Sequence, residues 1–124
     1  MSLRRLEVLQ WLGLIAGGVI WAAQHVVGYG ITEAVCDPGG RPWGISHDVW
    51  QASLMIAAAL LILGAEAASL AVLLATRSSS YEDAPAQGRI RFFAIAAMAA
   101  NAIFLMIVLL DGVAAIANVE CRKA

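Results

Sequence analysis

Residues 92–119 read FFAIAAMAANAIFLMIVLLDGVAAIANV, and Asp111 is the only charged residue in this stretch. An α-helix needs about 20 predominantly apolar residues to cross a hydrocarbon core about 30 Å thick, and this run exceeds that length. Backbone polar groups inside a bilayer must be satisfied within the segment itself. The run therefore predicts a transmembrane helix.

Two further apolar runs repeat this pattern. Residues 8–32 contain no charged side chain, and residues 49–76 contain only Glu66. The chain of 124 residues is 61% hydrophobic and 14% charged, with a mean hydropathy of +0.79, whereas soluble domains carry about 25% charged residues. A soluble three-helix bundle needs a polar face on each helix, and these runs offer none. The sequence predicts an all-α membrane protein with three transmembrane helices.

The expected helices cover about residues 8–32, 47–76 and 89–119, joined by loops at 33–46 and 77–88, in a single transmembrane domain over 1–124. Ser46 is a suitable N-cap for the second helix. The charged start of the chain is not followed by a signal-peptide cleavage site, so we expect the first run to be retained.

Basic residues orient the helices. Five lie before the first run, in the second loop or at the start of the third helix, against three on the opposite side. The five are Arg4, Arg5, Arg77, Arg89 and Arg91, and the three are Arg41, Arg122 and Lys123. Because Lys and Arg concentrate on the cytoplasmic side, we expect an inside N-terminus and an outside C-terminus, in a bacterial inner membrane.

The two cysteines fall on one side of the membrane in this topology. Cys36 follows the first run and Cys121 follows the third. An oxidising outer compartment permits a disulfide between them, which would join the ends of the first and third helices. Two free thiols near helix ends are the alternative.

The first helix carries a stripe of small and polar residues. Gly13 and Gly17 form a G-x-x-x-G pair, and the same ridge continues through Trp21 to His25, with Gln24 alongside. Small residues let helix backbones approach closely in membranes. We expect this stripe to face another helix.

Ionisable and amide groups inside the runs are candidate sites, because such groups are costly in a bilayer and usually face protein or water. By helical rise, His25 and Asp111 lie at similar depths in the outer leaflet, which predicts a hydrogen bond or ion pair between them. Glu66 and Asn101 lie together on the inner side of the centre, which predicts that a protonated Glu66 donates to Asn101. Each pair is interpreted as a structural contact or, alternatively, as a proton or quinone site.

Other chemistry receives no support from the residue pattern. His25 and His47 differ in depth by roughly 10–15 Å, which disfavours ligation of one haem, and no nucleophile–base pair, zinc spacing or phosphate loop is present. We expect the chain to have no catalytic residue, no metal and no cofactor of its own. Binding of a lipid or quinone at a subunit interface stays an open alternative. A net charge of −1 gives no reason to expect nucleic acid.

The order of Trp21, Gln24, His25 and Tyr29, followed by Cys36 and then Trp43, resembles a pattern of small bacterial membrane proteins that accompany haem–copper oxidases and related respiratory complexes. The resemblance covers the first third of the chain and transfers no catalytic residue. It implies an accessory subunit or assembly partner.

The expected function is therefore that of a non-catalytic accessory subunit of a respiratory oxidase or its supercomplex. Its helices would pack on other membrane subunits through the Gly13/Gly17 stripe, and its outer loop would touch an extracytoplasmic partner. Two alternatives stay open: a homo-oligomeric proton-coupled transporter using Glu66, and a redox protein linked to quinone or haem that uses His25 and Asp111.

Overall fold

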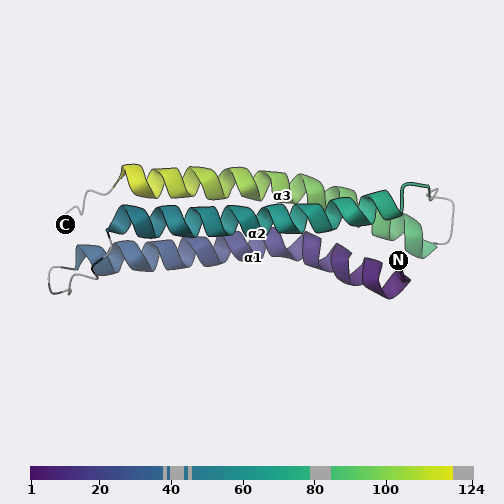
Figure 1. Ribbon diagram of the computed structural model, residues 1–124, viewed down its shortest axis with the longest axis horizontal. Helices are drawn as coiled ribbons and strands as arrows, with labels where there is room; N and C mark the ends of the chain where they lie inside the picture. Colours follow the sequence, from purple (N-terminus) through teal and green to yellow (C-terminus); the bar gives the residue numbers. More distant parts are fainter. Residues whose placement is uncertain (38, 40–43, 45, 79–84, 119–124) are drawn as a thin grey trace.

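The computed structural model describes residues 1–37, 39, 44, 46–78 and 85–118. Within them the chain forms α1 (Leu3–Cys36), α2 (His47–Ala75) and α3 (Pro85–Ala117). The helices run side by side along the long axis, and successive helices are antiparallel (Figure 1). Each helix packs against both of the others, so the bundle has one central seam.

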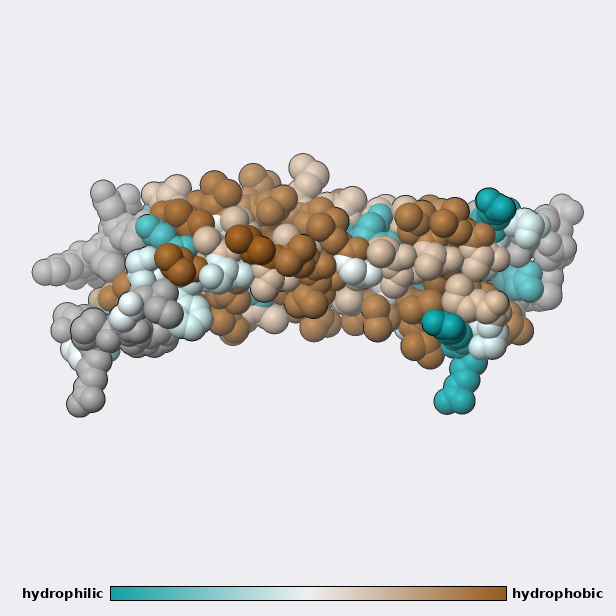
Figure 2. All heavy atoms as spheres, viewed as in Figure 1, coloured by the Kyte–Doolittle hydropathy of each residue, from teal (hydrophilic) through white to brown (hydrophobic). Residues whose placement is uncertain are grey.

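The exterior of the bundle is apolar along most of its length. Many large hydrophobic side chains are exposed, Val26, Met106 and Leu110 among the most, and Figure 2 shows hydrophobic residues over most of the visible face between the two ends. Water would penalise such a surface, whereas lipid tails match it. All three helices are long and apolar enough to cross a membrane, which confirms the predicted all-helical class and its three helices of membrane-spanning length.

The helix ends differ from those expected. α1 extends from Leu3 to Cys36, whereas the sequence indicated about 8–32. The charge-free run marks only the part of the helix that lies in hydrocarbon, and no helix-breaking residue lies at either end of that run. At about 1.5 Å per residue its 34 residues span about 51 Å, well beyond a core about 30 Å thick. α3 begins at Pro85, since proline in the first helical position costs no helix hydrogen bond.

The start of α2 follows the sequence closely. The Ser46 Oγ accepts a hydrogen bond from the Val49 N–H at 3.4 Å, and Asp48 lies in the first turn. The side chain satisfies one of the backbone donors that every helix start leaves open. The predicted N-cap is confirmed.

The seam between the helices contains two apolar clusters separated by polar and small residues. One cluster centres on Val72 and Ile90, the other on Ile62 and Val108. Several amides and hydroxyls are buried with them: Gln10, Gln24, Gln51, Ser69, Thr76 and Asn101. In a bilayer, apolar burial does not favour helix contact over lipid contact. The three amides among them that bond to another helix, Gln24, Gln51 and Asn101, therefore contribute to holding the helices together.

Candidate functional site

The Gly13/Gly17 stripe faces the other two helices of the same chain. A side-chain carbon at Gly13 would collide with the Ser69 hydroxyl of α2, and one at Gly17 would lie 2.5 Å from Asn101 Oδ1 on α3. Trp21, farther along the ridge, packs with Phe104 of α3. The expectation that this ridge meets a helix holds, and the helices it meets are α2 and α3.

Asn101 makes the deepest polar contact between helices. It is buried, and its Nδ2 donates to the backbone carbonyl of Gly13 at 3.0 Å. The missing side chain of Gly17, one turn away, makes room for this amide, because a β-carbon there would lie 2.5 Å from Asn101 Oδ1. The bond joins α3 to α1 near the middle of the bundle.

The predicted pair of Glu66 and Asn101 does not form. Glu66 Oε2 and Asn101 Oδ1 are both buried without a hydrogen-bond partner among the described residues. Asn101 instead bonds to α1, where its Nδ2 donates to Gly13 O, and its Oδ1, the atom that would accept from Glu66, lies beside Gly17 of α1. A comparison of side-chain depths does not reveal which helix a side chain faces.

The other predicted pair is brought together. His25 Nδ1 lies 2.9 Å from Asp111 Oδ2, joining α1 to α3. The pair is on the outside of the bundle, with side-chain exposures of 58% for His25 and 35% for Asp111.

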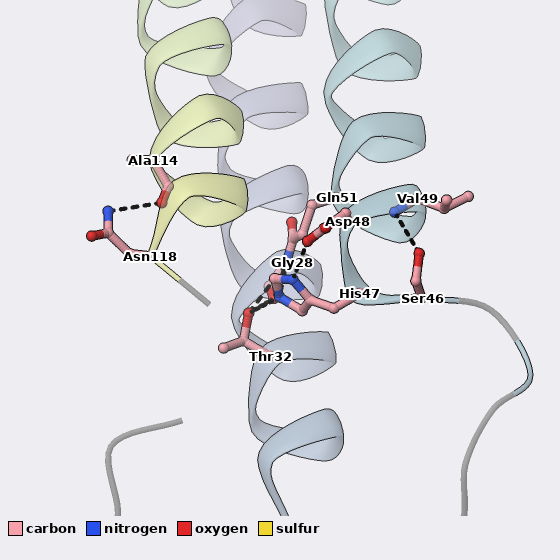
Figure 3. Close-up of polar contacts among 9 residues, drawn as sticks. All are labelled: Gly28, Thr32, Ser46, His47, Asp48, Val49, Gln51, Ala114 and Asn118. Carbon is pink, nitrogen blue, oxygen red and sulfur yellow. Dashed lines mark hydrogen bonds and ion pairs between the residues drawn. The ribbon is translucent and has the colours of Figure 1, made fainter. Parts of the chain in front are cut away.

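A second polar cluster joins the end of α1 to the start of α2 (Figure 3). Gln51 Nε2 donates to Gly28 O at 2.9 Å and to Thr32 Oγ1 at 3.2 Å. The Thr32 hydroxyl also lies 2.9 Å from His47 Nε2. The same hydroxyl lies 3.1 Å from Gly28 O as a donor, and its single proton serves either Gly28 O or His47 Nε2. His47 Nδ1 lies 3.6 Å from the Asp48 carboxylate and has no hydrogen-bond partner within the described residues. The cluster thereby pairs buried groups from two helices.

Gln24 lies between these two clusters. It is 6% exposed, and its Nε2 donates to Val108 O of α3 at 3.2 Å. Its Oε1 is buried and has no hydrogen-bond partner in the described part of the chain.

The two clusters share one pocket of about 180 Å³. All three helices line it: Gln24, His25, Gly28, Tyr29 and Thr32 from α1, Gln51 from α2, and Asp111, Ala114 and Ala115 from α3. The pocket therefore concentrates the polar side chains of one end of the bundle around a single hollow.

The sequence analysis gave no partner to three members of this arrangement. Thr32 was not proposed, Gln51 was noted only as a polar residue inside the second apolar run, and His47 was considered only as a haem ligand. A signal was present: His47 and Gln51 are four residues apart, so they share one helix face. The structure gives His25 and His47 different partners, Asp111 for the first and Thr32 for the second.

Among the described residues, no three His, Cys, Asp or Glu side chains are grouped closely enough to hold a metal ion. Cys36 lies at the end of α1. Cys121 lies outside the described residues, so its pairing with Cys36 stays a prediction.

The fold and this arrangement define an all-helical chain with three helices able to span a membrane and, at one end, a pocket lined by residues of all three helices. Comparisons with protein-family models, with curated proteins and with solved structures found no match to the chain.

Proposed function

We propose that this chain is a non-catalytic accessory subunit of a larger membrane complex. The observation that carries the proposal is the His25–Asp111 pair on the outside of the bundle. Ionisable groups at membrane depth normally face protein or water, because exposure to lipid tails is costly. A partner subunit that covers this pair removes the cost.

The depth of the pair supports this argument. His25 lies about 8 Å from the midpoint of α1 by helical rise, and the hydrocarbon core extends about 15 Å from its centre. Asp111 contacts His25 directly and so lies at the same level. Along α3 (Pro85–Ala117) the same rise places Asp111 about 15 Å from the helix midpoint. The pair therefore lies in the outer part of the hydrocarbon core, up to its edge.

The contact surface of the proposed complex differs from the one expected from sequence. The Gly13/Gly17 stripe is occupied by α2 and α3, so it is not available to a partner. The surface we propose is the outer α1–α3 face around His25 and Asp111. A respiratory oxidase or its supercomplex is the complex suggested by the resemblance in the first third of the chain.

Affinity purification of the tagged chain from native membranes in mild detergent tests this proposal. We expect other membrane subunits to co-purify, and His25→Ala with Asp111→Ala to lower their recovery several-fold. The matched control is Glu7→Gln with Arg89→Gln, which removes an exposed ion pair of 3.8 Å formed by residues far from this pocket and should leave recovery unchanged. Recovery of this chain alone, as monomer or homo-oligomer, would overturn the proposal.

The topology is part of the same proposal: N-terminus inside, C-terminus outside, in a bacterial inner membrane. Support comes from the basic residues, five on the proposed inner side against three on the outer. In this orientation Cys36 and Cys121 both face an oxidising compartment.

We therefore expect a Cys36–Cys121 disulfide in the chain isolated from cells. Non-reducing electrophoresis with a maleimide that adds mass to free thiols should show no labelling before reduction and two labels after it. Cys36→Ser should give one label without reduction. Two labels on the untreated chain would contradict both the disulfide and the outer location of this end.

A further inference from the structure

The geometry points to the pocket beside His25 and Asp111 as a binding site for a primary ammonium group, as in the headgroup of an ethanolamine phospholipid. The inference concerns the isolated chain and goes beyond the proposed role as a subunit. It rests on which hydrogen-bonding atoms of the pocket are already used.

Gln51 brings an unused acceptor to the pocket. It is 3% exposed, and its Nε2 donates both protons, to Gly28 O and to Thr32 Oγ1. A backbone carbonyl only accepts, so the contact with Gly28 O identifies the nitrogen end of the amide. Oε1 is the other end, and none of the described hydrogen bonds uses it.

Asp111 and Gln24 add two more acceptors. Asp111 binds His25 through Oδ2, and within the described residues Oδ1 takes part in no hydrogen bond. Gln24 donates through Nε2 to Val108 O, and its buried Oε1 has no partner in the described ranges. Three of the lining residues, one from each helix, thus carry an acceptor oxygen that no described hydrogen bond uses: Gln24, Gln51 and Asp111.

A primary ammonium matches this set. It carries three N–H donors, no acceptor and a positive charge that complements Asp111. A carbonyl, carboxylate or phosphate offers only acceptors and would leave these oxygens unsatisfied. Two further lining residues already have partners: the Tyr29 hydroxyl is hydrogen-bonded to Glu33, and His25 Nδ1 contacts Asp111. The ammonium is therefore the part of such a lipid that this pocket recognises.

The size and depth of the pocket suit a headgroup. Its volume of about 180 Å³ is below the roughly 300–1,000 Å³ of sites that enclose a drug-sized ligand. Along α1 its lining runs from Gln24 to Thr32, from about 7 Å to about 19 Å beyond the helix midpoint. This interval crosses the edge of the hydrocarbon core, about 15 Å from its centre, where lipid headgroups and chains meet.

The test is titration of the purified full chain in detergent with phosphatidylethanolamine or phosphatidylcholine of identical acyl chains, followed by native mass spectrometry. Choline carries the same charge as ethanolamine and has no N–H. We expect the ethanolamine lipid to bind about tenfold more tightly or better, as charge-assisted hydrogen bonds require. Equal binding of the two lipids by the wild-type chain would overturn the inference without the use of any variant.

Asp111→Asn should remove most of the preference for the ethanolamine lipid. The control is Asp37→Asn, which alters a carboxylate at the same end of the bundle but outside the pocket lining, and this variant should keep the preference. Preference unchanged in Asp111→Asn would also overturn the inference. Competition by millimolar free phosphoethanolamine identifies a soluble amine as the ligand, whereas its failure to compete identifies the lipid. These results are independent of the co-purification experiment, because no partner is present.

Discussion

Gly112→Ala is expected to lower the free energy of unfolding of the bundle by about 1–3 kcal/mol, the usual cost of overpacking. A β-carbon at Gly112 of α3 would lie 2.6 Å from Met55 Sδ and 2.7 Å from Met55 Cβ and Cγ on α2. The thioether end of Met55 is flexible, but its Cβ is fixed to the backbone. The two helices must therefore separate to admit the new atom.

Gly64→Ala is the matched control, because a β-carbon there meets nothing within 4 Å. We expect this variant to keep its stability or gain up to about 1 kcal/mol from the better helix propensity of alanine. Reversible unfolding in mixed micelles, followed by tryptophan fluorescence and circular dichroism, compares the two. Equal stability of the two variants would show that α2 and α3 do not approach closely at Gly112.

Asn101→Ala is expected to cost about 1–2 kcal/mol. It removes the hydrogen bond from Nδ2 to Gly13 O; single interhelical bonds in membranes contribute about 0.6 kcal/mol on average and up to about 1.7 kcal/mol. It also leaves a small cavity among residues that are fully packed.

The control for Asn101 is Asn118→Ala. Asn118 Nδ2 donates to Ala114 O of its own helix, at an exposed position, so its loss should change stability by less than about 0.5 kcal/mol. The same unfolding measurement applies to both. A loss at Asn118 as large as that at Asn101 would mean that the bond between helices contributes nothing specific.

The fold was largely predictable because the hydrophobic requirement of a membrane acts on composition alone. Three apolar runs of this length predict three helices, whichever contacts their individual side chains make. The ends of α1 were not predictable in the same way, because a charge marks where hydrocarbon stops and says nothing about where the helix stops.

The polar contacts were predictable only in part. Depth, which follows from helical rise, placed His25 and Asp111 at one level, and the structure brings them together. The same reasoning paired Glu66 with Asn101, yet Asn101 binds Gly13 O. Depth does not say which face of a helix a residue occupies.

Backbone acceptors were the second omission. Three buried amides each donate to a carbonyl of another helix: Gln24 to Val108 O, Gln51 to Gly28 O and Asn101 to Gly13 O. Two of these carbonyls belong to glycines, and at Gly28 a β-carbon would lie 3.0 Å from the Gln51 amide that binds there. A glycine on a polar helix face is therefore a candidate acceptor as well as a site of close packing.

The cluster of Gln51, Thr32, Gly28 and His47 uses no atom of α3. The first two helices to leave the ribosome thus carry several mutual hydrogen bonds at their connected end and can associate as a hairpin. The Gln24 amide and the Gly13 carbonyl, by contrast, gain their partners, Val108 O and Asn101 Nδ2, only when α3 packs on the hairpin. The chain is arranged for assembly in the order of its synthesis, with the last helix satisfying the polar groups that the hairpin leaves open.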